Sequence, residues 1–436
     1  MRILGLGLLT IASVNAVLFS SRSPTKGAIA VPIRRTCADP QRALERERAR
    51  LGRRQGSNNT VESTLYNTLN GYTVNITLGS PPQQLSVKLD TGSSDLLVNV
   101  PDSTLCQQGS CTGGTYSENR SQRHVAVATD FSINYVDGRN ASGDWISDDF
   151  GFAGVTPFPY TFGTGQTSTI DQGVLGIGYE SNSVWLTDHE RSNDSHTTLP
   201  QALVDFGYIE ILFGGVDHAK YSGNLSTVPI IKDSDGAFKE FLIALSGLSL
   251  DGQSLSSGLP ENALIDSGSQ LTYLPDQLAE TIYKQINAVS IPSIDDNIYV
   301  DCGLRSSDMS LGFKFDSVDQ RTISVPISTL LIDPAQPFRL DDNVQACIFG
   351  IAKASEAAGR SILGNTFLRN AYVVFNLARN EISLAQSVST SSSNIETIAN
   401  NATVPAALPA PASSAEQLVP CSMIMAFLIV MHGLMT

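Results

Sequence analysis

A short phrase that contains an aspartate occurs twice along the chain, and this repeat limits the possible folds more than any other feature. Val87-Lys-Leu-Asp90-Thr-Gly-Ser-Ser returns as Leu264-Ile-Asp266-Ser-Gly-Ser-Gln. A second, apolar phrase follows each copy, Gly173-Val-Leu-Gly176 in the first case and Ser361-Ile-Leu-Gly364 in the second. Because both phrases recur in the same order, we predict two related lobes of about 150 residues each.

Composition narrows the class of protein. The 436 residues are 42% hydrophobic and 16% charged, which is enough apolar material for a large core. With 28 Lys and Arg against 42 Asp and Glu, the formal net charge is -14; this excludes a protein that binds nucleic acid through a basic surface.

Short apolar runs end in turn residues, as at Gly79-Ser-Pro-Pro and Asp137-Gly138, and predict a mostly β chain with few helices. The clearest helix pattern extends from about Asp276 to Val289.

Asp90 and Asp266, the aspartates of the repeated phrase, are the candidate catalytic residues. If a pseudo-twofold axis relates the two lobes, equivalent residues meet at that axis and the two carboxyl groups come into contact. Two adjacent carboxyl groups do not both ionise readily, so the pair shares one proton. Such a pair offers a base that activates a water molecule and an acid that protonates a carbonyl group. The residues expected to support the pair are Thr91, Gly92, Ser93, Ser267, Gly268 and Ser269.

The first 54 residues have the features of segments that are removed during maturation. A basic residue, an apolar stretch and small residues predict a signal peptide over residues 1–16; a buried core helix is the alternative. Residues 17–54 end in Arg53-Arg54, and we predict a propeptide cleaved after this pair, with Arg34-Arg35 as a second candidate site. This head of 54 residues holds 11 of the 28 Lys and Arg but 3 of the 42 Asp and Glu. It is therefore expected to lie on the acidic body and to be released from it.

The other end of the chain predicts a surface anchor. Residues 387–411 are rich in Ser, Thr, Ala and Pro, which is typical of a solvated, glycosylated stalk. Residues 412–436 contain small residues, a spacer and an apolar end, the pattern of a GPI-attachment signal; a membrane-spanning tail is the alternative. Asn-X-Ser/Thr sequons between Asn58 and Asn401 favour a glycoprotein. We therefore expect passage through the secretory pathway to the extracellular surface, with a lipid anchor in the plasma membrane or cell wall.

Four cysteines lie between the two terminal signals, and an even number suits an oxidising compartment. These four are Cys106, Cys111, Cys302 and Cys347. They allow three pairings, of which we expect Cys106–Cys111 together with Cys302–Cys347. The histidines lack the spacing of metal ligands, so no metal site is expected.

The two aspartate phrases, with Phe213-Gly-Gly-Val-Asp217 and Ile362-Leu-Gly-Asn-Thr-Phe-Leu-Arg369, resemble the pepsin-like aspartic proteases, particularly the secreted and GPI-anchored, yapsin-like fungal members. The resemblance covers residues 70–386. It implies an all-β, bilobal double β-barrel fold with pseudo-twofold symmetry, and a cleft between a lobe over 55–215 and a lobe over 216–386. It also implies an endopeptidase that hydrolyses polypeptides at acid pH without a cofactor, inhibited before activation by its own propeptide. We expect a monomer.

The same resemblance implies a hairpin flap over the cleft. Its expected substrate-binding residues are Tyr135, Val136, Asp137 and Gly138, with Tyr135 in the place of the flap tyrosine. The sequence departs from the family pattern in four places. Gln270 follows the second aspartate phrase where Ser or Thr is commoner. Leu97 stands where a tryptophan usually bonds that tyrosine, and Val136 replaces a glycine. Around Tyr208–Ile211 the chain lacks a strand that most relatives carry.

Two other functions remain open at this point. A catalytically impaired relative that binds ligands at the cell surface is favoured by the departures at Leu97 and Val136. A structural wall glycoprotein is favoured only by the stalk and the sequons. The retention of both aspartates favours the enzyme, because an inert cleft has no physical need for two carboxyl groups that repel each other.

Overall fold

The N-terminal lobe is a sheet that closes on itself. The structure, a computed structural model, describes residues 33–35, 65–68, 71–152, 157–188, 196–205, 215–255, 258–315, 322–334, 336–377, 379–390, 394–397 and 426–428. In this lobe the strand order is β1-β2-β3-β4-β10-β5-β8-β7-β6, with β9 beside β7, and a further pairing of β3 with β7 closes the sheet. The strands are β1 (Ile33–Arg35), β2 (Leu65–Thr68), β3 (Gly71–Leu78), β4 (Gln83–Asp90), β5 (Leu96–Asn99), β6 (Val125–Asn134), β7 (Asn140–Phe152), β8 (Phe158–Gly165), β9 (Thr167–Ser168) and β10 (Val174–Gly176).

The C-terminal lobe is built around a sheet of order β20-β19-β13-β15-β24-β16-β23, with β14 beside β13. Its strands are β13 (Leu242–Leu250), β14 (Gln253–Leu255), β15 (Glu261–Ile265), β16 (Thr272–Leu274), β19 (Ser310–Phe315), β20 (Thr322–Pro326), β23 (Ile351–Lys353) and β24 (Ser361–Leu363). A smaller sheet of order β17-β18-β22-β21 extends this lobe. It contains β17 (Val289–Ser290), β18 (Ile298–Asp301), β21 (Leu331–Ile332) and β22 (Ala346–Phe349).

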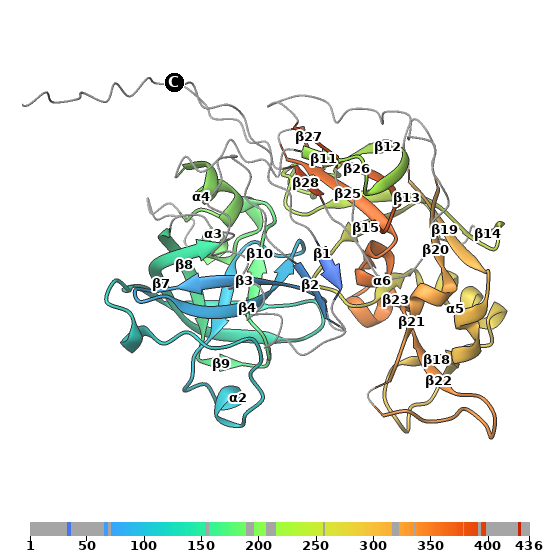
Figure 1. The fold of residues 1–436 in the computed structure, drawn as a ribbon, viewed down its shortest axis with the longest axis horizontal. Coiled ribbons are helices and arrows are strands. Elements are labelled where there is room, and N and C mark those ends of the chain that lie inside the picture. Colours follow the sequence, from blue (N-terminus) through green and yellow to red (C-terminus); the bar gives the residue numbers. More distant parts are fainter. Residues whose placement is uncertain are drawn as a thin grey trace, which may run out of the picture.

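Further strands form a sheet of order β12-β26-β25-β28 and the pair β11-β27. They are β11 (Gly215–Asp217), β12 (Tyr221–Pro229), β25 (Ala371–Asn376), β26 (Glu381–Ser387), β27 (Ile395–Thr397) and β28 (Ala426–Leu428). Figure 1 shows the two lobes side by side, with the strands β3–β10 in one and β13–β24 in the other. The predicted all-β, bilobal fold class is confirmed.

Helices are few and short, as predicted. In the part of the chain that the structure describes, the α-helices are α2 (Thr104–Gln107), α3 (Val184–Asp188), α4 (Leu199–Asp205), α5 (Asp276–Gln285) and α6 (Asn365–Leu368). The 3₁₀ turns are η1 (Glu118–Arg120), η2 (Glu180–Asn182), η3 (Cys302–Ser306), η4 (Ile327–Leu330) and η5 (Ala354–Ala357). No helix among the described residues is both long enough and apolar enough to cross a membrane.

The predicted end of the main helix at Val289 is wrong. Helix α5 ends at Gln285 because Asn287 adopts a left-handed conformation with φ 54°, which asparagine tolerates better than most residues. The N–H of Ala288 then donates to the carbonyl of Tyr283 (2.9 Å), and this bond closes the last turn. Val289 belongs to β17 and is 42% exposed. Its apolar character matched the helical spacing by coincidence.

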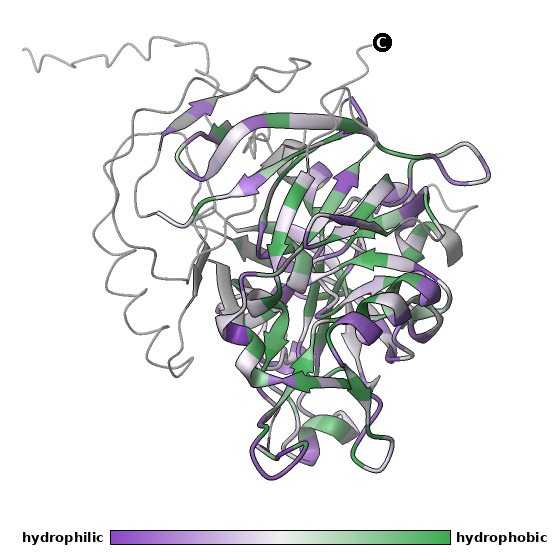
Figure 2. Ribbon diagram, turned by 90° about the vertical axis from the view of Figure 1, so that its right-hand side faces the viewer, coloured by the Kyte–Doolittle hydropathy of each residue, from purple (hydrophilic) through white to green (hydrophobic). Residues whose placement is uncertain are grey.

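The hydrophobic core is continuous through both lobes, from Tyr72 and Leu85 in the first to Phe313 and Phe367 in the second. In Figure 2 the strands in the middle of the molecule carry mostly hydrophobic residues, and hydrophilic residues gather in the outer loops.

Both expected disulfides are present, Cys106–Cys111 and Cys302–Cys347.

Several sequence predictions lie outside the described residues. These are the signal peptide, most of the propeptide with Arg53-Arg54, most of the stalk and of the anchor signal, and the segment Tyr208–Ile211. The head is described at β1, the stalk at residues 387–390 and 394–397 with β27, and the anchor signal at β28. Strand β1 pairs in parallel with β2, and β28 pairs in parallel with β25.

Candidate active site

The two phrases of each sequence repeat pair with each other as parallel strands. In the N-terminal lobe β4 pairs with β10, and Asp90 lies opposite Gly176. In the C-terminal lobe β15 pairs with β24, and Ile265, the residue before Asp266, lies opposite Leu363. Each aspartate therefore stands at the carboxyl end of a strand bonded to the second phrase. The duplication in the sequence is a duplication of this strand pair.

Asp90 and Asp266 lie next to each other where the lobes meet, and we refer to them as the dyad. A Cβ atom added at Gly268 would lie 2.5 Å from Asp90 Oδ1 and 3.1 Å from Asp266 Oδ1, so both oxygens border the same point. A Cβ atom at Gly92 would lie 2.8 Å from Asp266 Oδ1. Each glycine thus faces the aspartate of the other lobe, and neither position has room for a side chain.

Each carboxyl group of the dyad accepts the same two hydrogen bonds from its own phrase. The N–H of Gly92 donates to Asp90 Oδ1 (2.8 Å), and the hydroxyl of Ser93 donates to Asp90 Oδ2 (2.5 Å). In the other lobe the N–H of Gly268 donates to the second aspartate at 2.7 Å, and the hydroxyl of Ser269 donates to it at 2.6 Å. Matching bonds of this kind are expected from two lobes related by a pseudo-twofold axis.

Thr91 and Ser267 tie the two aspartate turns to each other. Thr91 Oγ1 donates to the carbonyl of Ile265 (2.9 Å) and accepts from the N–H of Ser267 (2.9 Å). In return Ser267 Oγ donates to the carbonyl of Leu89 (2.8 Å) and accepts from the N–H of Thr91 (3.2 Å). Both side chains are buried. These reciprocal bonds between lobes hold the two carboxyl groups at a fixed separation.

The environment of the dyad favours the protonated form of Asp90. Burial and then the charge of Asp266 raise the pKa of Asp90 from 3.8 to about 8. Burial acts by removing water from the charged form, and the second carboxylate acts by repulsion. The hydrogen bonds from Ser93 and Gly92 oppose these effects because they stabilise the carboxylate. A carboxyl group that keeps its proton next to a second carboxyl group is the arrangement expected of an acid–base pair.

The residues of the predicted flap form the turn of the hairpin of β6 and β7. Its turn is closed by the N–H of Tyr135, which donates to the carbonyl of Arg139 (2.8 Å), and by the N–H of Gly138, which donates to the carbonyl of Tyr135 (3.0 Å). Gly138 has φ 83°, a conformation that favours glycine. Val136 is not among the described residues with positive φ. A β-branched side chain therefore fits where the related proteases usually carry glycine.

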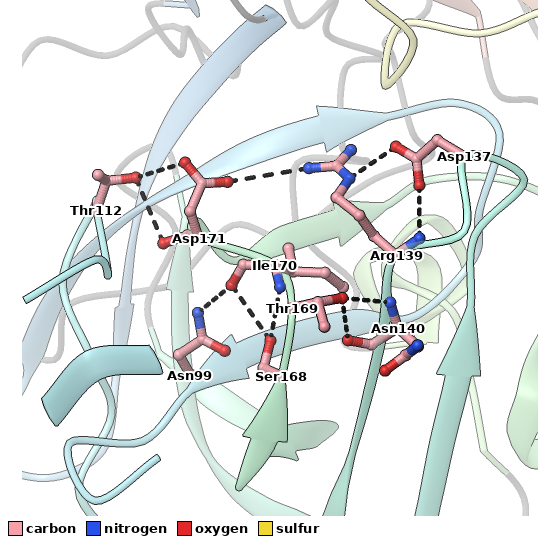
Figure 3. A network of polar contacts seen from close by, with 9 residues as sticks. All are labelled: Asn99, Thr112, Asp137, Arg139, Asn140, Ser168, Thr169, Ile170 and Asp171. Carbon is pink, nitrogen blue, oxygen red and sulfur yellow. Dashed lines mark hydrogen bonds and ion pairs between the residues drawn. The ribbon is translucent and has the colours of Figure 1, made fainter. Parts of the chain in front are cut away.

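The charged tip of the flap is held by an arginine that the sequence did not single out. Arg139 Nε donates to Asp137 Oδ2 (2.7 Å), and an Arg139 terminal nitrogen lies 3.9 Å from Asp171 Oδ1, as Figure 3 shows. Thr112 Oγ1 donates to the other oxygen of Asp171. Burial and then the charge of Asp137 raise the pKa of Tyr273 in the C-terminal lobe. The tip is therefore close enough to act on a residue of the opposite lobe.

Tyr135 lies close to the dyad, but its hydroxyl has no hydrogen-bond partner among the described residues. Burial and then the charge of Asp90 raise the pKa of Tyr135 well above its ordinary value. The ring packs against a buried cluster that includes Leu97, Trp145 and Trp185. Leu97 is fully buried there, and a leucine offers no donor to the tyrosine. The hydroxyl of Ser93 is close enough to oppose the effects of burial and of Asp90 and to lower the pKa of Tyr135, but it does not meet the geometry of a hydrogen bond. Packing against the cluster therefore accounts for most of the contacts that position Tyr135.

A buried histidine contacts the segment that follows the first aspartate phrase. His196 Nε2 is 3.0 Å from Asp95 Oδ1, and the hydroxyl of Ser183 donates to the same oxygen (2.6 Å). The N–H of Val184 donates to the other oxygen of Asp95 (2.9 Å). Asp95 is five residues beyond Asp90, and these bonds anchor the turn that carries the dyad residue. Nothing in the local sequence around His196 indicates this contact.

The fold and the site together define a class, the bilobal β proteins with one aspartate from each lobe at the junction. Residues 71–387 match the family described as "Eukaryotic aspartyl protease", and the chain belongs to this family. It is 41% identical over 357 residues to "Probable aspartic-type endopeptidase opsB" of Aspergillus fumigatus, covering 76% of this chain and 72% of the relative. It is 35% identical over 367 residues to "Secreted aspartic protease 3" of Candida albicans, covering 77% and 84%. The predicted family resemblance is confirmed.

Proposed function

We propose that the protein is an endopeptidase that hydrolyses peptide bonds at acid pH through the dyad of Asp90 and Asp266. The observation that carries the proposal is the matched pair of buried carboxyl groups, each bonded to its own glycine N–H and serine hydroxyl. Family membership and the printed names of the relatives support the same reaction class.

In the proposed reaction one carboxyl group acts as an acid and the other as a base. The ionised carboxylate removes a proton from a water molecule, whose oxygen attacks the carbonyl carbon of the scissile peptide bond. The protonated carboxyl group donates its proton to the carbonyl oxygen, which gives a tetrahedral gem-diol. Transfer of a proton to the amide nitrogen then breaks the C–N bond and releases an amine and a carboxylic acid. The reciprocal bonds of Thr91 and Ser267 fix the spacing that both transfers require.

The direct test uses the full-length secreted protein, brought to about pH 4 and mixed with an unfolded polypeptide. We expect digestion, and we expect Asp90→Asn to reduce kcat/KM at least about a hundredfold, because the variant cannot complete the acid–base pair. Asp308→Asn is the matched control, since Asp308 is an exposed aspartate of the C-terminal lobe. Equal digestion by the wild-type protein and by Asp90→Asn would exclude the dyad as the catalyst.

The proposal includes a basic propeptide that covers the acidic body until acidification. Its support is the charge contrast, with 11 of the 28 Lys and Arg in the first 54 residues, and the pairing of β1 with β2. Protonation of carboxylates at low pH weakens this attraction and permits cleavage after Arg54. Mass spectrometry after acid treatment should find a product that begins at Gln55. A chain that stays at full length while it digests substrate would rule out this activation step.

Secretion followed by GPI anchoring at the cell surface belongs to the same proposal. It rests on the terminal sequence patterns and on the secreted relative. Release of the protein from cells by a phosphatidylinositol-specific phospholipase would support a GPI anchor, and resistance to it would favour a peptide-anchored or free protein.

One observation favours the alternative of a catalytically impaired surface-binding protein. The hydroxyl of Tyr135 has no partner among the described residues because Leu97 provides none. If the flap is thereby misplaced for catalysis, the protein binds peptides without cutting them. The digestion test above separates the two functions, since a binder leaves the polypeptide intact at every pH.

A further inference from the structure

A lysine lies on the same strand face as the catalytic aspartate of the N-terminal lobe. Lys88 and Asp90 are two residues apart on β4, where Lys88 pairs with Thr73 on one side and with Val174 on the other. Side chains two residues apart on a regular strand point to the same face and are separated by about 7 Å. The side chain of Lys88 therefore leaves β4 on the same face as Asp90. The charges of Arg139 and Asp171 act on its ammonium group more strongly than that of Asp90 does.

Lys88 is buried, yet its ammonium group has no partner in the part of the chain that the structure describes. The residue is 6% exposed, and no ion pair or side-chain hydrogen bond joins it to a described residue. Lysine is almost never buried unless its charge is paired, because the ammonium group must replace the water that it loses. Burial, followed by the charge of Arg139, lowers the pKa of Lys88. The nitrogen of the ammonium group is not among the described side-chain atoms that are both unpaired and closed to solvent, so the stem is buried while the charged end reaches solvent.

The nearby carboxylates are engaged elsewhere. The charged groups that face Lys88 are Arg139, Asp171, Asp137 and Asp90. Asp137 and Asp171 are both bound to Arg139 on the flap (Figure 3). Asp90 accepts from its own glycine and serine and shares the proton of the dyad. None of the three carboxylates forms an ion pair with the lysine. Its N–H donors are therefore available to bind an acceptor group of the substrate.

We propose that Lys88 binds the carboxylate of a glutamate or aspartate side chain of the substrate, at one position within about two residues of the scissile bond. The inference rests on the proposed function, because it assigns a specificity to the same site. A carboxylate suits this position better than a neutral carbonyl group. It supplies the opposite charge as well as the acceptor, and charge-assisted hydrogen bonds are roughly twice as strong as neutral ones.

The test compares matched peptides that differ only in Glu or Gln at a single position near the cleavage site. The full-length secreted protein is first brought to about pH 4 and then assayed at about pH 5, where a glutamate side chain is mostly ionised. We expect the wild-type kcat/KM to be about ten- to a hundredfold higher for Glu than for Gln at one position. Lys88→Met should reduce this ratio to about one, and Lys88→Arg should retain most of it.

Lys284→Met is the matched control, because Lys284 is exposed on α5, a helix that carries none of the residues of the dyad or of the predicted flap. It should leave the Glu-to-Gln ratio as in the wild-type protein. If the wild-type protein cuts every peptide with no preference for Glu at any position, the inference is overturned while the proposed function stands. A preference that survives Lys88→Met also overturns it. If no peptide is cut, the proposed function fails and the inference fails with it.

Discussion

The raised pKa of Asp90 predicts an unusual dependence of stability on pH. A carboxyl group with a pKa of about 8 in the folded protein and 3.8 in the unfolded chain takes up a proton on folding at pH values between the two. Its contribution to stability is therefore complete below the unfolded pKa, near 4, and is lost progressively as the pH rises toward 8. Asp90→Asn replaces the group with one that does not titrate and has nearly the same shape.

The size of this change in stability follows from the number of protons that the protein releases on unfolding. Where the unfolded chain has lost this proton and the folded protein has kept it, the free energy of unfolding falls by about 1.4 kcal/mol per pH unit. The stability of Asp90→Asn relative to the wild-type protein should therefore increase by about 2–3 kcal/mol between about pH 5 and about pH 7. Titrating groups that do not interact with Asp90 contribute equally to both proteins and cancel in the difference.

The assay is urea unfolding followed by tryptophan fluorescence at several pH values, with the wild-type protein, Asp90→Asn and Asp308→Asn. Asp308 is exposed, so its variant should follow the wild-type curve at every pH. Parallel curves for the wild-type protein and Asp90→Asn would refute the reasoning, because they would mean that Asp90 carries the same charge in the folded and unfolded states.

Two further predictions concern the buried hydroxyls around the site. Thr91→Val removes the donor to one carbonyl and the acceptor for one N–H of the opposite lobe, and it should lower the free energy of unfolding in urea by about 2–5 kcal/mol. Thr322→Val, at an exposed strand position, should lower it by less than about 0.5 kcal/mol. Equal losses for the two variants would contradict the role of Thr91 between the lobes. Tyr135→Phe removes a hydroxyl without a described partner and should leave the melting temperature unchanged or higher. Tyr116→Phe removes the donor to Oδ2 of buried Asp148, which keeps the N–H of Asp149 on its Oδ1, and should lower the melting temperature. A larger loss for Tyr135→Phe would show that its hydroxyl is bonded.

The dyad could be found from the sequence because the signal is a repeat. Each aspartate follows an apolar strand and precedes a small, turn-forming phrase, and the second apolar phrase of each copy pairs with that strand. Periodicity also gave the start of helix α5 at Asp276. It did not give the end, because the left-handed Asn287 terminates the helix although the apolar spacing continues.

Contacts between residues far apart in the chain could not be predicted in the same way. Nothing local indicates that His196 bonds Asp95, or that Arg139 also binds Asp171. Lys88 looked like one polar residue within an apolar strand. Its importance depends on its burial and on the absence of a partner among the described residues, and both arise only after folding.

The sequence by itself determined the duplicated architecture and the identity of the two acidic residues. Each of these features depends on local, ordered sequence patterns that specify strand ends and turns. Only the tertiary structure decided which charges face one another, which hydroxyls bridge the lobes and which cation is left for a ligand. The physical reason is that these interactions depend on distance and on the exclusion of water. Neither quantity exists until strands from distant parts of the chain have packed together.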